Sequence, residues 1–279
     1  MAASLYTPDD DMREAAAEAG RAEDVASAKR AKRAQLVHYL GMPIFLGLAL
    51  LALFLWVQGL ELDSIEARSL RPQVLIDATV QHIWLTVLST FFVLILAIPL
   101  GIFATRPKYQ RLAPAIIGLG NAGQAIPSIG LLGLIFFLGA TTPLIPRTGT
   151  TTAVLALVAY SFLSILRNTM VGLDQVDRSV LEAGRGMGMS QSRVLRKIEL
   201  PLAVPVILAG VRTALVLNVG TATLVFFIGG GGLGEIIITG VGLRRASVLW
   251  TGAVLTAVLA LFVDYLAGLI EEKLTPKGL

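Results

Sequence analysis

The residue types that usually carry chemistry are scarce in this chain of 279 residues. It has no cysteine and only two histidines, His38 and His82, each at the flank of an apolar run. This composition excludes a disulfide scaffold, a thiolate metal site and a multi-histidine metal cluster, and it disfavours a Ser-His-Asp triad. We therefore expect interfacial histidines, no catalytic residue, no metal site and no cofactor held by this chain.

Charged side chains gather instead in one polar segment, residues 181–205, with the sequence LEAGRGMGMSQSRVLRKIELPLAVP. Its charged members are Glu182, Arg185, Arg193, Arg196, Lys197 and Glu199. Apolar stretches lie on both sides of it. Each of these charges would lose several kcal/mol of hydration free energy in hydrocarbon. We expect the segment to project into water as a cytoplasmic loop, at about 167–204.

The loop itself predicts two short helices joined at a turn. Asp177 and Ser179 are candidate caps of the first helix, Ser190 is a candidate cap of the second, and Pro201 should end the second. Between the helices, three glycines allow close backbone approach: Gly184, Gly186 and Gly188. The second helix should bury one apolar face formed by Val194, Leu195, Ile198 and Leu200.

The composition of the whole chain is that of a membrane protein. Hydrophobic residues make up 55% of it, charged residues 15%, and the mean hydropathy is +0.75, whereas a soluble domain has about 25% charged residues. A spanning helix needs about 20 largely apolar residues. Six windows qualify and predict an all-α membrane protein with six transmembrane helices: 36–60, 80–105, 112–139, 150–166, 204–229 and 248–270.

The polar stretch 1–35 precedes the first window and ends in four basic residues, Lys29, Arg30, Lys32 and Arg33. It lacks the early apolar core of a secretory signal. We expect a cytoplasmic tail that orients the chain and attracts anionic membrane lipid, rather than a nucleic-acid-binding arm. Residues 36–279 would then form the transmembrane domain.

The positive-inside rule fixes the expected orientation. With the N-terminus inside, 17 of the 23 Lys and Arg residues lie on the cytoplasmic side. Six of them are in the tail, three in the first cytoplasmic loop, six in the charged loop and its flanks, and two at the C-terminus. Five lie outside, and Arg212 lies within a helix. Six helices return the C-terminus to the cytoplasm, and the charged loop faces the side that contains ATP.

Glycine-rich stretches invite a nucleotide-binding interpretation, which the sequence does not support. Residues 229–234, GGGGLG, lack a following Lys-Ser/Thr and follow no predicted strand. Gly184, Gly186 and Gly188 have the wrong spacing for a dinucleotide fingerprint. We expect residues 229–234 to form a flexible turn at the outer mouth, and any ATP and Mg²⁺ to be bound by a partner subunit.

Polar residues in the third window are candidates for lining a solute pathway. Asn121, Gln124 and Ser128 have i, i+3, i+7 spacing, which predicts one helix face. Pro127 should kink or unwind the helix, because it removes a backbone donor and clashes with the preceding turn. The alternative is interhelical hydrogen bonding, with close packing at Gly118, Gly120 and Gly123. The sequence leaves both open.

The fifth window adds Asn218 and Thr221 as pathway candidates. It also contains Arg212, about 12 Å in from Val204, and Asp264 lies about 9 Å in from the same side in the last window. An unpaired charge at such a depth is costly. We expect Arg212 and Asp264 to form a structural ion pair rather than to contact substrate.

The charged loop resembles the signature of binding-protein-dependent ABC importer permeases, E-A-A, three residues, Gly, nine residues, I-x-L-P. Glu182, Ala183 and Gly188 match its first half; Ile198, Leu200 and Pro201 match the second; Gly184 replaces the usual alanine. Three stretches, NAGQAIPSIGLLGL, RNTMVGLDQVDRSVLEAGRGMGMS and LAGVRTALVLNVGTATLVFFIGGGGLG, are similar to permeases of glycine betaine, carnitine and choline importers.

The resemblance implies a type I importer permease fold in the cell inner membrane and a transport subunit without enzymatic activity. It also implies partners: cytoplasmic ATPase subunits docked on residues 182–201, a second permease that is identical or paralogous, and an extracytoplasmic binding protein that delivers the solute. The alternatives are a permease for another small solute, such as methionine or a sulfonate, a secondary transporter or channel, and a membrane enzyme.

Overall fold

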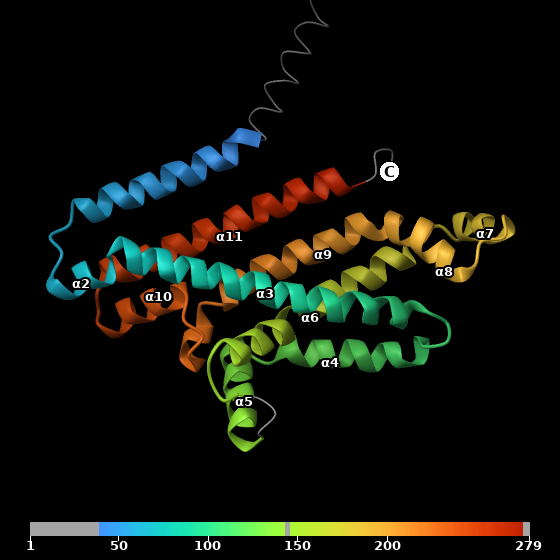
Figure 1. Ribbon diagram of the computed structural model, residues 1–279, viewed down its shortest axis with the longest axis horizontal. Coiled ribbons are helices and arrows are strands. Elements are labelled where there is room, and N and C mark those ends of the chain that lie inside the picture. Colours follow the sequence, from blue (N-terminus) through green and yellow to red (C-terminus); the bar gives the residue numbers. More distant parts are fainter. Residues whose placement is uncertain (1–38, 143–145, 276–279) are drawn as a thin grey trace, which may run out of the picture. The chain divides into compact units, whose positions relative to one another are not determined.

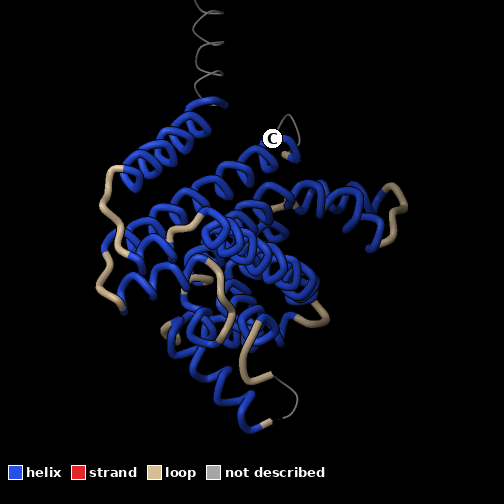
Figure 2. Tube along the Cα trace, turned by 60° about the vertical axis from the view of Figure 1, so that its left-hand side comes forward, coloured by secondary structure: helices blue, strands red, loops and turns tan. Residues whose placement is uncertain are grey.

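The computed structural model describes residues 39–142 and 146–275. Two units divide the chain, residues 1–49 and 50–279, and each is described by itself. Throughout the described residues the chain forms helices and loops, and no strand (Figure 2). The predicted all-α fold is confirmed. The predictions for the tail (1–35) and for His38 lie outside the described residues.

Within residues 39–142 and 146–275, five helices are long and apolar enough to cross a membrane. They are Tyr39–Gln58, α3 (Pro72–Thr105), α6 (Thr150–Asp174), the continuous helix Gln191–Thr221, and α11 (Ala246–Leu274) (Figure 1). Each overlaps one predicted window, although α3, α6 and the helix from Gln191 extend beyond it by eight or more residues. Hydropathy windows miss these ends because polar helix turns continue past the apolar core.

The sixth apolar segment is a bent pair, not a straight span. A 3₁₀ turn (Gln110–Leu112) leads into α4 (Ala113–Ala125), and α5 (Ser128–Thr141) follows at an angle of 106° (Figure 1). Ile126 has an extended backbone, ψ 127°, as expected of a residue that precedes proline. The predicted kink or unwinding at Pro127 is confirmed, and it divides the predicted window 112–139 into two helices.

The remaining elements are short, apart from α9, whose 22 residues form most of the long helix Gln191–Thr221. They are α2 (Ser64–Ser69), α7 (Arg178–Gly186), α8 (Gln191–Val194), a π turn (Leu195–Glu199), α9 (Leu200–Thr221), a 3₁₀ turn (Leu224–Ile228) and α10 (Leu233–Gly242). Helices α8 and α9, with the π turn between them, form the continuous helix Gln191–Thr221.

Helices α3, α6 and α9 form the centre of unit 50–279 and approach one another through small residues. A Cβ on Gly101 of α3 would lie 2.8 Å from the Thr169 side chain of α6. A Cβ on Gly172 of α6 would lie 3.0 Å from the carbonyl oxygen of Ala203 in α9. Because lipid tails give helices no hydrophobic reason to associate, close packing of this kind holds membrane helices together.

Helix α2 is tied to the start of α11 by a polar cluster. Asp63 caps α2 and accepts the backbone N–H groups of Ile65 and Glu66, and these hydrogen bonds hold the pKa of its carboxyl below the usual value. Arg245 pairs with Asp63 at 2.6 Å. The Ser247 hydroxyl donates to Glu66 at 2.6 Å and lowers the pKa of that carboxyl.

Gly234, in the first turn of α10, gives a direct test of the close packing. A Cβ there would collide with the Thr223 carbonyl group, whose backbone cannot rotate away. We expect Gly234→Ala to destabilise the protein by about 1–3 kcal/mol, measured as a lower midpoint of thermal unfolding in detergent.

Gly242→Ala is the matched control, since a Cβ at the end of the same helix would meet nothing within 4 Å. Equal midpoints for the two variants would contradict the proposed close packing of α10.

Candidate functional site

The first half of the signature segment (residues 177–201) is helix α7. Asp177 begins it as N-cap, and its carboxylate accepts the backbone N–H of Ser179 at 2.8 Å. This hydrogen bond to the charged form lowers the pKa of Asp177. Ser179 lies inside the first turn as the donor. Asp177 is therefore the capping residue of the two that the sequence offered.

A Schellman motif ends α7. The N–H of Met189 donates to the carbonyl of Gly184 at 3.1 Å, and the N–H of Gly188 donates to that of Arg185 at 2.9 Å. Gly188 occupies the left-handed position of this motif, with φ +80°, where a residue with a Cβ is strained. The conformation explains physically why the signature has glycine at position 188.

Gly184 joins the two halves of the signature segment. It is buried, and a Cβ there would lie 2.7 Å from Cδ1 of Ile198 and 3.5 Å from Cγ2 of Val194. A small residue at position 184 and an apolar one at 198 are thus parts of one contact. Glu182 and Ala183 are exposed on the same helix.

The second half of the segment differs from the sequence prediction. Ser190 precedes α8, but its side chain makes no capping hydrogen bond, and its hydroxyl lies 3.4 Å from that of Ser192. Pro201 does not end the helix. It stands in the first turn of α9, after a π turn in which Leu200 donates to the carbonyl of Leu195. The wider turn accommodates a proline, which lacks the donor that an uninterrupted α-helix would require.

The predicted apolar face of the second helix lies toward the protein: Val194 is buried, and Leu195, Ile198 and Leu200 are half-buried. Helices α7 and α8 lie beyond the α6 and α9 ends of the bundle (Figure 1). Their outer surface is charged and includes an exposed apolar side chain, Met187, which is 72% exposed. This surface is suited to docking another protein and offers no group of three or more metal-ligating side chains within the described ranges.

The polar residues of the broken third segment contact α6. Arg167 donates to the Asn121 side-chain oxygen at 2.8 Å. Gln124 donates to the Tyr160 carbonyl at 3.3 Å and to the Ser164 hydroxyl at 3.2 Å. Asn121 and Gln124 thus make interhelical hydrogen bonds, which the sequence allowed as the alternative to lining a solute pathway.

The predicted shared face of Asn121, Gln124 and Ser128 is wrong, because the chain bends between Gln124 and Ser128. Of the three candidate close-packing glycines, Gly120 and Gly123 lie against α6, at Leu163 and Ala159, whereas a Cβ at Gly118 would meet nothing within 4 Å.

Ser128 and Thr221 lie close to each other, away from the contacts of Asn121 and Gln124 with α6. They line one small, mainly apolar cavity with Tyr160 and residues of α5, α6 and the 3₁₀ turn 224–228. Asn218, one turn before Thr221, is fully buried between α9 and α3 and donates to the Thr90 hydroxyl at 3.0 Å. In this conformation Asn218 faces protein, not an open pathway.

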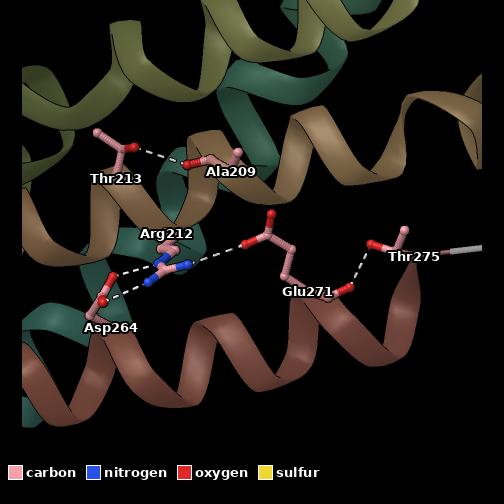
Figure 3. A network of polar contacts seen from close by, with 6 residues as sticks. All are labelled: Ala209, Arg212, Thr213, Asp264, Glu271 and Thr275. Carbon is pink, nitrogen blue, oxygen red and sulfur yellow. Dashed lines mark hydrogen bonds and ion pairs between the residues drawn. The ribbon is translucent and has the colours of Figure 1, made fainter. Parts of the chain in front are cut away.

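Arg212 and Asp264 meet across α9 and α11 (Figure 3). The Arg212 Nε and Nη2 atoms donate to the two Asp264 carboxylate oxygens at 2.5 and 2.7 Å. Glu271, two turns further along α11, has a carboxylate oxygen 3.7 Å from Arg212 Nη1. Gly268, between the two acids, leaves room for the guanidinium, which would lie 3.4 Å from a Cβ at that position.

The glycine-rich stretch and His82 form a buried arrangement that sequence reasoning missed. His82 is fully buried, not interfacial: Leu233 N–H donates to its Nδ1 at 3.2 Å, and its Nε2 lies 2.9 Å from the Val219 carbonyl oxygen. One ring nitrogen accepts and the other donates, which requires the neutral Nε2–H tautomer. Gln81 donates to the Gly230 carbonyl and accepts from the Gly232 N–H.

The turn 229–234 is therefore fixed by side chains of α3, and the expected flexible turn is wrong. Gly229, Gly231 and Gly232 all have positive φ, so these glycines serve backbone geometry. A histidine in an apolar helix together with a run of glycines was the available signal, but neither indicates the other as its partner.

Gly188 yields a prediction about the local stability of α7. Gly188→Ala should weaken the end of this helix by about 1–2 kcal/mol through left-handed backbone strain. Hydrogen–deuterium exchange of the α7 amides should then accelerate roughly five- to thirtyfold.

Gly186→Ala is the control, because position 186 is helical and a Cβ there also meets nothing within 4 Å. If both variants exchanged at the same rate, strain at Gly188 would be disproved.

The ion pair yields a double-mutant cycle. Arg212→Ala leaves Asp264 without its main partner, and we expect the combined Arg212→Ala, Asp264→Ala variant to lose less stability than the two single losses added together. The measurement is the thermal midpoint of each variant in detergent. Additive losses would reject an energetic role for the pair.

Comparison with known proteins agrees with these features. Residues 97–276 match the model of a family described as binding-protein-dependent transport system inner membrane component. The glycine betaine/carnitine/choline transport system permease protein OpuCB of Bacillus subtilis is 41% identical over 205 residues, 74% of this chain and 90% of that protein. The osmoprotectant import permease protein OsmY of Salmonella typhimurium is 38% identical over 241 residues, 86% and 97% of the two chains.

Solved structures show the same fold. A chain of the MetNI methionine ABC transporter in an inward-facing conformation matches with a TM-score of 0.64 at 24% identity and covers 72% of this chain and 96% of that one. An amino acid ABC transporter matches with a TM-score of 0.63 at 17% identity and covers 77% and 100%. The chain therefore belongs to the family of inner-membrane components of binding-protein-dependent transport systems, as a multi-pass permease subunit of an ABC importer.

Proposed function

We propose that this chain is the permease subunit of an ATP-driven importer for compatible solutes of the quaternary ammonium class, such as glycine betaine, choline or carnitine. The observation that carries the solute class is the identity of 37–42% to permeases named for these solutes or for osmoprotectants. The signature segment, with its exposed α7 surface, supports the ATP-driven part of the proposal.

In this proposal, the ATPase docks on α7 and α8, with Glu182 and Ala183 on the exposed face. Movement of the docked segment enters the membrane directly, because α8, the π turn and α9 are one continuous helix from Gln191 to Thr221. Helix α9 in turn packs against α3, α6 and α11. The signature segment, the N-terminus and the C-terminus would lie on the cytoplasmic side, as the distribution of basic residues favours.

The remaining partners are a second permease subunit and an extracytoplasmic binding protein that releases solute to the outer side. ATP and Mg²⁺ would be held by the ATPase subunits. The Ser128–Thr221 cavity is a candidate stretch of the solute route, because it combines two hydroxyls and the Tyr160 side chain with apolar walls.

Uptake in cells tests the proposal. The chain is co-expressed with an ATPase and a binding protein in bacteria that lack other compatible-solute importers, and uptake of labelled glycine betaine is followed at high osmolarity. We expect uptake that excess unlabelled choline or carnitine reduces and excess methionine does not. Inhibition by methionine alone would overturn the solute class.

Glu182→Lys tests the ATPase contact in the same cells. Reversing a buried interfacial charge costs about 2–5 kcal/mol, so ATPase co-purification and uptake should both be lost while membrane insertion is unchanged. Asp174→Lys is the control, an equal charge reversal at the exposed end of α6. Normal ATPase binding by the Glu182 variant would refute docking on α7.

A further inference from the structure

An ion pair that involves none of the residues that match the signature joins the signature segment to α3. Arg106 follows the last residue of α3 and donates to Glu199 through two nitrogens, Nη1 at 3.0 Å and Nη2 at 2.7 Å. Its Nε donates to the Ile102 carbonyl at 3.2 Å. All three guanidinium nitrogens are therefore engaged, and the two-bond geometry fixes the relative orientation of the two side chains.

Burial makes the pair costly to break. The Glu199 side chain is only 9% exposed and that of Arg106 is 30% exposed. Removing one partner of a largely desolvated pair leaves the other charge without compensation. Arg196 and Lys197, the neighbouring cations in sequence, are exposed. The cation that Glu199 engages instead comes from an element 93 residues away.

Glu199 lies at the point where the signature segment enters the bundle. It is the last residue of the π turn Leu195–Glu199, which stands between α8 and α9. Its neighbours in sequence, Ile198 and Leu200, are half-buried. The acid is therefore enclosed at the start of α9, where Arg106 reaches it from the end of α3.

We propose that Arg106 and Glu199 are positioning residues that connect the signature segment to α3, so that movement of α7 and α8 displaces α3 together with α9. This inference rests on the proposed function, in which an ATPase moves that segment. The close contacts of Gly101 with Thr169 and of Gly172 with Ala203 lie at the same ends of α3, α6 and α9. Together with the ion pair, these contacts hold the adjacent ends of α3, α6 and α9 in fixed positions relative to one another.

A purely structural role would give a different result from a coupling role. Loss of a stabilising pair lowers the amount of active complex, so ATP hydrolysis and solute transport fall in proportion. Loss of a coupling pair leaves the ATPase docked on α7 and hydrolysing ATP while α3 no longer follows. The discriminating quantity is solute transported per ATP hydrolysed.

The experiment uses the complete complex in proteoliposomes with its ATPase and binding protein and labelled glycine betaine. Arg106→Gln and Glu199→Gln each remove one charge, and the double variant Arg106→Glu, Glu199→Arg exchanges the two. Arg111→Gln is the matched control, since Arg111 is exposed in the same loop and makes no ion pair among the described residues. We expect solute per ATP to fall at least tenfold in the single variants, to recover at least partly on exchange, and to be unchanged in the control.

Arg106→Lys covers the case in which the Gln variants do not fold. It keeps the charge that orients the loop but cannot form two parallel hydrogen bonds, and we expect a reduced ratio with normal assembly. An unchanged ratio in Arg106→Lys, or a proportional loss of hydrolysis and transport in the Gln variants, would overturn the inference. Co-purification of the unaltered chain with the ATPase tests the proposed function separately. If the unaltered chain did not bind an ATPase, the proposed function would be contradicted, rather than the role of the ion pair.

Discussion

A polar group in the hydrocarbon layer is costly unless it finds a partner inside the protein, and this constraint organises the molecule, with the buried Asn218 Oδ1 as an exception. Hydroxyls in the spans donate to carbonyls one turn earlier, as Thr86, Thr169 and Thr251 do. Larger polar side chains have partners on other helices. His82 and Asn218 are both fully buried within the unit, and each ties α3 to the chain around α9. Polar residues thus act first as connections between helices.

The same constraint explains where irregular backbone occurs. The break at Pro127 and the turn 229–234 interrupt helices that would otherwise satisfy their own backbone groups. At the second of these, Gln81 and His82 bond with the freed backbone groups directly. The π turn at 195–199 lies instead where the chain passes from the polar segment into α9. The first two interruptions thus coincide with a proline and with a run of glycines, and Pro201 follows the third.

Much of the fold could be predicted from the sequence because hydropathy and charge report directly on the surrounding solvent. The spans, the polar segment between the fourth and fifth, and the approach of Arg212 to Asp264 all follow from that principle. Local rules failed where a tertiary partner decides the outcome. Pro201 continues a helix because a π turn precedes it, and no spacing in the sequence indicates that turn.

His82 and Gly184 show the same limit in the candidate site. The contact partners of His82 are 137 and 151 residues away, and those of Gly184 lie in the following helix. A single sequence shows the small residue or the histidine, but it does not show which other residue will be in contact with it. The sequence predicts that Gly184 allows another part of the chain to approach closely, but it does not indicate that the Ile198 side chain is the group that fills the space of a Cβ.

The continuous helix Gln191–Thr221 has a mechanical consequence. Its 31 residues follow a helical path about 45 Å long, with one end in the polar segment and the other beside the 3₁₀ turn at Leu224, and the path bends between α8 and α9 (Figure 1). If the part within the bundle, α9, pivots near its middle, a tilt of about 5° moves its two ends by about 1.5 Å in opposite directions. A push on the end of α9 next to the polar segment therefore becomes an opposite displacement at its other end, and no loop interrupts the hydrogen-bonded helix between them.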